Sequence, residues 1–434
     1  MASPTAATPP SDDAFRAAMR RRRGGARSDT FARSELRALS ALCAVYGLRL
    51  LGLYMVLPVL SLYARGLEGS TPLLTGLSVG VYGFANMLLV LPFGVLSDRV
   101  GRKRAIALGL CVFAAGSVLA GATKSIAGLL AGRALQGAGA VSSVVVALVG
   151  DVTRPRVRAR AMTLLGMSVG LAFMLGVVGG PALAGELGVR SLFLITGALA
   201  VGALLLVLAA VPAPRGGGRQ AEFEPAAGEI RAALLQPELL KLDAGMFVIH
   251  FALTALFVVV PILLDDLLPA YHLWRVYAPV LLVGMAVAVP TMTLAEKTRS
   301  VHRVLYGGIV LFGMSFLVLR FLGDGLAGMV AGMGVFVIAF GLLEPTLTTL
   351  LTRFTTPQSR GTAAGVFSMS GFLGSFLGGA TGGLLLESQG ALFLVLAGLA
   401  LPWLLLSLRM RGLRGVARPE PPRRADIPPG AGAD

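Results

Sequence analysis

The sequence predicts an all-α membrane protein in which twelve transmembrane helices form two six-helix bundles. Of the 434 residues, 55% are hydrophobic and 14% are charged, with a mean hydropathy of +0.79, whereas soluble domains carry about 25% charged residues. The apolar residues gather in twelve runs of about 20 residues or more, the length needed to cross a bilayer. Of the 38 Lys and Arg residues, 31 lie on one side of these runs.

The expected spans form two sets. The first set covers residues 36–63, 73–96, 104–123, 126–150, 158–184 and 190–211, and the second covers 242–268, 273–295, 303–322, 325–351, 360–386 and 389–410. We expect residues 36–211 and 241–410 to be separate bundles. The polar residues 212–240 form a linker with room for a short interfacial helix. Residues 1–35 and 411–434 hold too little apolar content to fold and are expected to be disordered basic tails.

The distribution of basic residues predicts the orientation of the chain. Both tails, the linker and the loops on the same side carry the 31 basic residues, while the opposite loops carry five. Cytoplasmic loops are enriched in Lys and Arg, so both termini are expected in the cytoplasm of a bacterium whose inner membrane holds the protein. The net charge of +16 is thereby explained by topology. Lipid is the expected partner, and nucleic acid is not.

An internal repeat supports the division into halves. Pro92 aligns with Pro290, and Asp98 aligns with Glu296, both at an offset of 198 residues. Parallel repeats of six spans, related by a pseudo-two-fold axis along the membrane normal, are typical of secondary transporters that bind substrate between the halves. No ATPase motif and no metal-ligand cluster is evident, so we expect no cofactor and a proton gradient as the energy source.

The loop between the second and third spans carries the most specific motif, GVLSDRVGRKR over residues 94–104. It resembles the signature G-x-L-x-D-R-x-G-R-K of the major facilitator superfamily. The matching residues are Gly94, Leu96, Asp98, Arg99, Gly101, Arg102 and Lys103. In physical terms, Gly94 is expected to permit close helix contact and Gly101 to make the turn.

The charges of this loop predict an inner gate. Asp98 is expected to face the positive N-terminus of a helix in the other half, near Arg360 and Gly361. Arg102 is expected to pair with Asp151, the lone acid at the cytoplasmic end of the fourth span. Breaking these contacts would open the gate. The alternative is a solvated basic loop that only sets the topology.

A second motif lies in the fourth span, where residues 129–143 read LLAGRALQGAGAVSS. Arg133 and Gln136 match the R-x-x-Q-G pattern that the resemblance places on a cavity-lining helix. An arginine inside a span is costly and is by default a functional hypothesis. The alternative is a structural arginine that extends towards the outer surface.

A third motif, GVVGGPALAG over residues 176–185, lies in the fifth span. It is similar to the antiporter-associated pattern G-x-x-x-G-P-x-x-G-G, with Ala184 in place of one glycine. The matching residues are Gly176, Gly180, Pro181 and Gly185. The resemblance implies export, whereas the alternative is ordinary close packing of helices through small residues.

Three further strings narrow the resemblance. Residues 47–63, 272–277 and 340–347, which read GLRLLGLYMVLPVLSLY, HLWRVY and FGLLEPTL, look like the YajR-type branch of bacterial drug:proton antiporters. The resemblance covers about residues 36–410. Members of this branch can carry a soluble C-terminal domain, for which we expect no counterpart among the 24 or so residues after the last span.

Two ionisable residues inside spans are the candidates for proton coupling. Glu344 is the one carboxylate that the pattern places well inside a span, about 12 Å from the cytoplasmic end at 1.5 Å per residue. His250 lies at nearly the same depth in the seventh span. Desolvation disfavours the charged form of either group, so both are suited to exchange protons. The alternatives are a neutral carboxyl bonded to Thr348 or water, and a histidine that only packs.

A deep charge and several polar residues indicate where a substrate would bind. Arg49 lies about 20 Å into the first span. It is expected to balance Glu344, to attract an anionic substrate, or to bond backbone carbonyls as a structural residue. The other residues expected to line a mixed aromatic and polar cavity are Tyr46, Tyr54, Asn86 and Gln136.

These observations predict a monomeric proton-coupled exporter of a small amphipathic compound that works by alternating access. Within transport, the alternative is proton-linked uptake of a sugar or organic acid. From other classes, the alternatives are a membrane receptor that retained the fold without transport and, third, an intramembrane enzyme.

Overall fold

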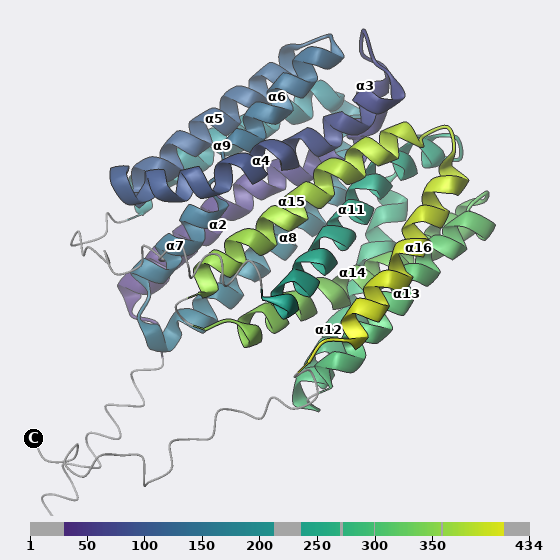
Figure 1. The fold of residues 1–434 in the computed structure, drawn as a ribbon. Coiled ribbons are helices and arrows are strands. Elements are labelled where there is room, and N and C mark those ends of the chain that lie inside the picture. The colour runs from purple at the N-terminus through teal and green to yellow at the C-terminus, as the bar shows by residue number, and fades with distance from the viewer. Residues whose placement is uncertain (1–29, 212–235, 270–271, 299, 357–358, 412–434) are drawn as a thin grey trace, which may run out of the picture. The chain divides into compact units, whose positions relative to one another are not determined.

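The computed structural model describes residues 30–211, 236–269, 272–298, 300–356 and 359–411. Within these ranges the regular elements are helices (Figure 1), apart from an isolated bridge between Glu68 and Ser125. In chain order they are α2 (Arg33–Val56), η2 (Leu57–Val59), α3 (Leu60–Arg65), α4 (Pro72–Val100), α5 (Arg102–Ala122), α6 (Ile126–Ala138), α7 (Ser142–Val152), α8 (Pro155–Leu187), α9 (Val189–Ala210), α11 (Pro237–Asp265), α12 (Trp274–Lys297), α13 (Val301–Leu322), α14 (Leu326–Phe354), α15 (Arg360–Leu384) and α16 (Gln389–Leu408).

Twelve helical stretches in the described ranges are long and apolar enough to cross a membrane, so the predicted number of spans is confirmed. The predicted ends agree with the observed ones to within five residues. The disorder predicted for the two tails and the interfacial helix predicted in the linker fall almost entirely outside the described residues. The sidedness of the termini stays a prediction.

Local sequence explains where several helices begin. Pro72 stands in the first turn of α4, where a missing N–H is harmless, and the Thr71 hydroxyl accepts from the Leu74 N–H at 3.3 Å. Ser125 caps α6 by accepting from the Gly128 N–H at 3.2 Å. These caps satisfy backbone donors that would otherwise lack a partner at a helix start.

The chain divides into two compact units. The first comprises Met1–Phe223, Leu253–Ala278 and Ser375–Glu387, and the second comprises Glu224–Ala252, Pro279–Gly374 and Ser388–Asp434. The first unit therefore joins the six amino-terminal spans to parts of α11, α12 and α15. The division into bundles over residues 36–211 and 241–410 remains a prediction.

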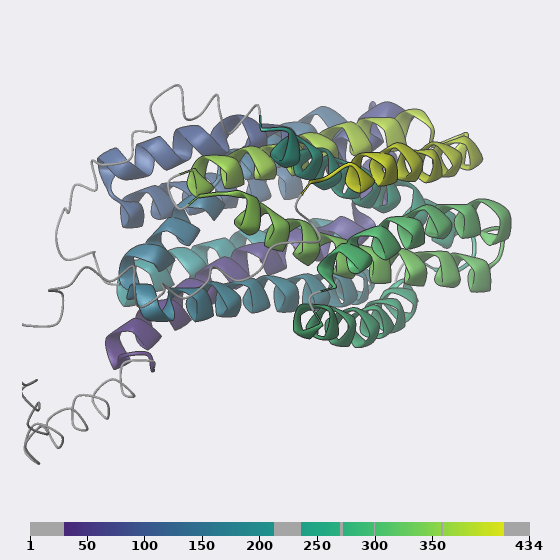
Figure 2. The ribbon, with the colours of Figure 1, turned by 60° about the horizontal axis from the view of Figure 1, so that its bottom comes forward.

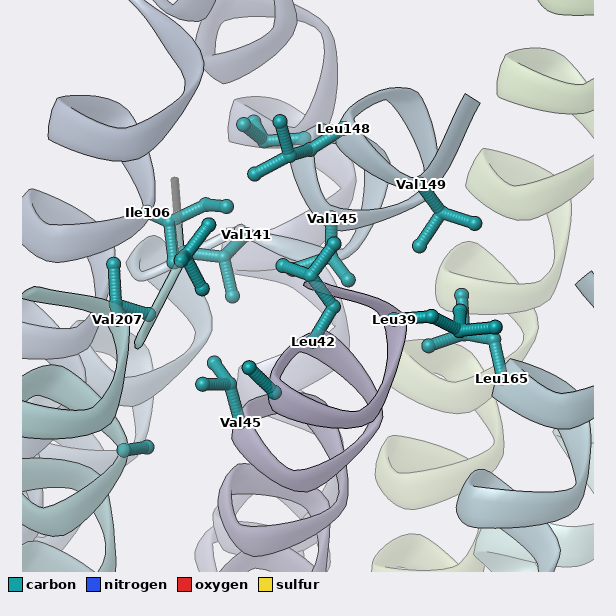
Figure 3. Close-up of a cluster of buried hydrophobic side chains, with 14 of the residues drawn as sticks. Leu39, Leu42, Val45, Ile106, Val141, Val145, Leu148, Val149, Leu165 and Val207 are labelled. Atoms are coloured by element: carbon teal, nitrogen blue, oxygen red, sulfur yellow. The ribbon is translucent and has the colours of Figure 1, made fainter. Parts of the chain in front are cut away.

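The core of the first unit lies among helices that are far apart in sequence. α2 packs along α8 and α9, and α5 packs along α6 and α9. Figure 3 shows the side chains that fill the space between them, with Leu42 and Val45 from α2, Ile106 from α5, and Val145 from α7. The side chain of Val207 from α9 completes this group (Figure 3). Each of these side chains is fully buried, so the arrangement of α2, α5, α7 and α9 is fixed by apolar packing.

The second unit contains α13, α14 and α16, with α13 packed against both others. The two green helices α13 and α14 lie side by side in Figure 2. Aromatic rings fill the space between them: Phe312 contacts Phe316 at 5.0 Å and Trp403 at 5.5 Å between ring centroids, both edge to face. Phe336 from α14 contacts Phe316 at 5.6 Å. Edge-to-face rings add to the energy of apolar burial.

Candidate functional site

Arg49 lies in the middle of α2 with 2% of its surface exposed. Its Nη2 donates to the Gly139 carbonyl oxygen at 2.9 Å and to the Tyr82 hydroxyl at 3.2 Å. The guanidinium also lies over the ring of Phe113, 5.0 Å from its centroid. Its Nε is buried and has no hydrogen-bond acceptor among the described residues. Arg49 was expected, among other roles, to bond a backbone carbonyl, and it does so. The attraction of an anion stays a prediction.

Arg133 belongs to the same cluster. It is 2% exposed, and its guanidinium lies over the Tyr82 ring at 5.1 Å. Its Nε donates to the Ser78 carbonyl oxygen at 3.2 Å and its Nη1 donates to Gln136 at 2.9 Å. Gln136 in turn donates to the Ser117 hydroxyl at 2.8 Å. Arg133 therefore does not extend towards the outer surface as the alternative expected; it is held inside the bundle by neutral acceptors.

The other residues expected near a substrate are partly brought together. Asn86 is buried, and its Nδ2 donates to the Tyr82 hydroxyl at 3.3 Å, while its Oδ1 accepts from no residue that the structure describes. Tyr46 and Tyr54 are half-buried and, with Tyr82, pack on an apolar group that includes Phe113. Tyr82 therefore joins Arg49, Arg133 and Asn86. Tyr82 was not among the predicted residues, although it lies one helical turn before the predicted Asn86 on α4.

The fourth span is not the continuous helix that the sequence predicts. It is divided into α6 and α7 by residues 139–141, and Gly139 leaves the helical conformation at φ −73° and ψ 53°. A Cβ at Gly139 would lie 3.1 Å from the Phe113 Cβ, so α5 and α6 approach closely at this point. At the break the Gly139 carbonyl accepts from the Val141 N–H at 2.8 Å and from Arg49 Nη2 at 2.9 Å. The cation also lies at the negative C-terminal end of α6, which is favourable.

The loop between α4 and α5 has two ion pairs, of which one was expected. Arg102 Nη1 lies 2.7 Å from Asp98 Oδ1, and Arg102 Nε lies 3.3 Å from Asp151 Oδ2, so the predicted Arg102–Asp151 pair is present. Lys103 donates to the carbonyl oxygens of Leu208 and Val211, both at 2.9 Å. It thereby ties the loop to the end of α9. The expected proximity of Asp98 to Arg360, which belong to different units, stays a prediction.

The two glycines of this motif, Gly94 and Gly101, differ in backbone conformation and in surroundings. Gly101 ends α4 and begins α5 with φ +93°, a conformation that L side chains rarely adopt, so the predicted turn is present. A Cβ at Gly94 would meet nothing within 4 Å. Among the described residues, therefore, no helix makes the close contact expected at Gly94. Leu96 is half-buried and Arg99 is exposed.

The glycine motif of α8 packs against α2. A Cβ at Gly176 would lie 2.6 Å from the Tyr54 Cβ, and one at Gly180 would overlap the Met55 carbonyl. Pro181 is buried within α8, and Gly185 is exposed near the end of that helix. Gly176 and Gly180 thus allow close packing of two helices, which was the alternative interpretation of this motif. Their relation to export stays a prediction.

In the second unit, Glu344 and His250 share a neighbour. The His250 ring lies 6.1 Å from the Phe340 ring, edge to face, and Phe340 precedes Glu344 by four residues on α14. Residues four apart lie on the same face of a helix. The His250 Nδ1 lies 3.2 Å from the Met246 carbonyl oxygen. The Glu344 carboxyl is half-buried and has no hydrogen-bond or ion-pair partner among the described residues.

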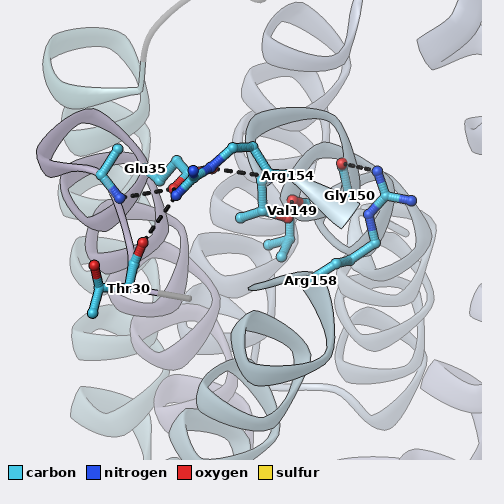
Figure 4. A network of polar contacts seen from close by, with 8 residues as sticks. Thr30, Glu35, Val149, Gly150, Arg154 and Arg158 are labelled. Atoms are coloured by element: carbon cyan, nitrogen blue, oxygen red, sulfur yellow. Dashed lines mark hydrogen bonds and ion pairs between the residues drawn. The ribbon is translucent and has the colours of Figure 1, made fainter. Parts of the chain in front are cut away.

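Two acids of structural importance were not among the predicted residues. Asp243 on α11 is 9% exposed and, within the described ranges, its carboxyl has no partner. Glu35 in the first turn of α2 accepts from Arg154 Nε at 2.9 Å and from Arg154 Nη2 at 3.0 Å (Figure 4). The exposed Arg154 guanidinium has its pKa raised further by this carboxylate. The sequence could have indicated Asp243, because this acid lies two residues after Lys241, at the start of an apolar run.

Comparisons with known proteins agree with this architecture. Residues 42–379 and 242–432 match the family model of the Major Facilitator Superfamily. The chain is 38% identical over 381 residues to the inner membrane transport protein YajR of Escherichia coli strain K12, which covers 87% of this chain and 84% of the relative. The predicted resemblance to the YajR-type branch is therefore confirmed.

Solved structures show the same fold at low sequence identity. A bacterial homologue of the human lysosomal transporter Spinster, in an inward-facing and occupied conformation, aligns with a TM-score of 0.72 at 17% identity, covering 88% of this chain and 98% of that one. The nucleoside transporter NupG aligns with a TM-score of 0.68 at 14% identity, covering 87% and 98%. With twelve helices able to cross a membrane and a family match over most of its length, the chain belongs to the Major Facilitator Superfamily of membrane transporters.

Proposed function

We propose that the protein is a proton-coupled exporter of small amphipathic compounds that works by alternating access, as a monomer with both termini in the cytoplasm. The observation that carries the proposal is the Glu344 carboxyl, which lies inside α14 with no ion-pair partner among the described residues. An ionisable group within a span is costly, and such groups mark ion pathways and proton relays. No cofactor is needed, because the proton gradient supplies the energy.

Protonation of Glu344 changes the relative stability of the states in which its carboxyl is exposed to water or enclosed. The ionised carboxylate favours a state in which water reaches it, and the neutral acid favours a state in which it is enclosed. Pro345 follows directly and cannot donate to the Gly341 carbonyl. A helix weakened at this point can bend there when the carboxyl changes charge. Glu344 would thus bias the two halves between inward and outward states.

His250 is the second group suited to exchange protons. When its Nδ1–H donates to the Met246 carbonyl, Nε2 is the unprotonated nitrogen of the neutral ring. That nitrogen can then receive a proton. The Phe340 ring, which precedes Glu344 by four residues on α14, packs edge to face against the His250 ring. A proton would pass between the two residues through water rather than directly.

The loop between α4 and α5 supplies the proposed inner gate. Arg102 pairs with Asp98 and Asp151 at once, and these side chains are 24%, 62% and 40% exposed. Exposed ion pairs contribute about 0.2–1 kcal/mol each. Energies of this size suit a latch that opens and closes in every cycle, and a much stronger contact would hold one state.

The test is the movement of protons in inverted membrane vesicles that contain the protein. A pH gradient is imposed, its size is followed with a fluorescent weak base, and a panel of amphipathic compounds is added. We expect a transported compound to dissipate the gradient in wild-type vesicles. Glu344→Gln keeps the size of the side chain but cannot ionise, so it should abolish the dissipation.

Glu387→Gln is the matched control, because Glu387 is exposed beyond the end of α15. It should behave as wild type. Undiminished coupling in Glu344→Gln would remove the proton role of that residue. Coupled movement in the opposite direction would favour uptake of a sugar or organic acid. Specific binding without movement of any compound would favour a receptor.

A further inference from the structure

The buried cluster of the first unit has two cations and no anion. Arg49 and Arg133 are each 2% exposed, and their hydrogen-bond acceptors among the described residues are neutral. These acceptors are the Gly139 and Ser78 carbonyls, the Tyr82 hydroxyl and the Gln136 amide. Buried charges in proteins are normally paired, because desolvation costs several kcal/mol per ion. The two guanidinium groups are therefore only partly compensated.

The two arginines are not equally satisfied. Arg133 uses Nε and Nη1 in hydrogen bonds, and it is fixed by Gln136. Arg49 makes both of its described hydrogen bonds through Nη2, so its Nε and Nη1 have no acceptor within the described ranges. Nε is moreover completely buried. Arg49 is thus the residue of the pair with an unused N–H donor, Nε, that is completely buried.

Asn86 provides a second unsatisfied group in the same place. Its Nδ2 donates to the Tyr82 hydroxyl, which also accepts from Arg49, and its Oδ1 is buried without a partner. If the amide turns by 180°, the Tyr82 hydroxyl donates to Oδ1 and Nδ2 becomes a free donor. Arg49 and Asn86 then present N–H groups on either side of one hydroxyl.

Aromatic and apolar side chains surround this polar group. Tyr46, Tyr54 and Tyr82 pack on the cluster that contains Leu50 and Phe113. The Tyr54 ring also meets Phe173 edge to face at 5.0 Å. A molecule with an acidic group and an aromatic or apolar body would match both parts. A cation would be repelled by the two guanidinium charges.

We infer that Arg49 and Asn86 bind the acidic group of the transported compound, so that the substrate class is an amphipathic organic anion such as an aromatic carboxylate or sulfonate. This inference rests on the proposed transport function. All of the residues concerned lie in the first unit. The site is buried in this conformation, and the anion would enter when the surrounding helices separate in the transport cycle.

The experiment measures binding of matched naphthalene probes to the purified full-length protein in nanodiscs of neutral lipid. The probes are 1-naphthoate and 1-naphthalenesulfonate, the cation 1-naphthylmethylammonium, and the neutral 1-naphthalenemethanol. We expect at least one of the two anions to bind about tenfold or more tightly than the cation and the neutral probe. Equal or tighter binding of the cation, or no saturable binding of either anion, would overturn the inference.

Variants then assign the binding to Arg49. Arg49→Gln should abolish anion binding, and Arg49→Lys should weaken it about tenfold because an ammonium lacks the planar set of donors. Tyr82→Phe removes the hydroxyl between Arg49 and Asn86 and should weaken anion binding several-fold. Because this change is milder, it still tests the site if Arg49→Gln does not fold. Arg65→Gln is the control, since Arg65 is exposed at the end of α3. Unchanged anion binding in both Arg49→Lys and Tyr82→Phe would overturn the assignment.

Failure of this inference is distinguishable from failure of the proposed function. Proton-coupled movement of cations alone would retain the function and overturn the anion site. Binding of the anions that depends on Arg49, without proton-coupled movement, would support the anion site and overturn the function.

Discussion

Arg154 holds Glu35 through two parallel hydrogen bonds, from Nε to Oε1 at 2.9 Å and from Nη2 to Oε2 at 3.0 Å. The Arg154 and Ala32 N–H groups donate to the same carboxylate at 3.0 and 2.8 Å. The pair joins the start of α2 to the residue before α8. The Glu35 side chain is 8% exposed, whereas that of Arg154 is 48% exposed.

Arg154→Ala should therefore destabilise the protein by about 1–3 kcal/mol, because it leaves a buried carboxylate with fewer donors. The measurement is the melting temperature of the purified protein in detergent. Arg158→Ala is the control, since the exposed Arg158 donates, within the described part of the chain, only to the Gly150 carbonyl, at 2.9 Å (Figure 4). If both variants melt at the wild-type temperature, the pair with Glu35 does not stabilise the fold.

The turn at Gly101 gives a second prediction. Gly101 has φ +93°, and a side chain in a sparsely populated backbone conformation costs about 1–3 kcal/mol. Gly101→Ala should lower the melting temperature accordingly. Gly94→Ala lies inside α4 in open space, and Ala in a helix is about 0.5–1 kcal/mol better than Gly. The two variants should shift the melting temperature in opposite directions, and shifts of the same sign would contradict this explanation.

The contact between α8 and α2 gives a third prediction. A Cβ at Gly180 would overlap the Met55 backbone, whereas a Cβ at the neighbouring Gly179 would meet nothing within 4 Å. Overpacking of a close contact costs about 1–3 kcal/mol. Gly180→Ala should therefore destabilise the protein by that amount, and Gly179→Ala should leave it unchanged or slightly more stable. Equal thermal stability of the two variants would show that α8 and α2 do not pack as closely as described.

The parts of the structure that could be predicted from sequence depend on local pattern. The twelve spans follow from the length of the apolar runs, because a bilayer demands about 20 apolar residues for each helix. The Arg102–Asp151 pair follows from a lone acid at the end of one helix and a basic loop at the end of its neighbour. Gly101 follows from the need for a sharp turn between two long helices.

The parts that could not be predicted depend on partners distant in sequence. The break at Gly139 is accompanied by a hydrogen bond from Arg49, which is 90 residues away. Glu35 is paired with Arg154, which is 119 residues away. Nothing in the residues next to Gly139 or Glu35 specifies these partners, because the packing of α2 against its neighbouring helices brings them together.

Asp243 gives the fourth prediction. Its carboxyl is 9% exposed on α11 and, in the described part of the chain, makes no hydrogen bond or ion pair. A buried polar group without a partner costs about 1–3 kcal/mol, and more when it is charged. Asp243→Asn keeps a polar side chain of the same size but cannot carry a charge, so at neutral pH it should stabilise the protein by the extra cost of that charge, about 1 kcal/mol. The measurement is again the melting temperature in detergent.

The matched control for Asp243 is Asp265→Asn, which removes an exposed acid at the other end of the same helix. Surface substitutions away from special features usually change stability by less than about 0.5 kcal/mol, so this control should melt as wild type. The presence of a buried acid that lowers stability suggests a function for that acid. If Asp243→Asn raises the melting temperature and also slows proton-coupled transport, Asp243 joins His250 on α11 as part of the proton path. If the variant melts at a lower temperature than wild type, the Asp243 carboxyl is stabilising and the prediction is wrong.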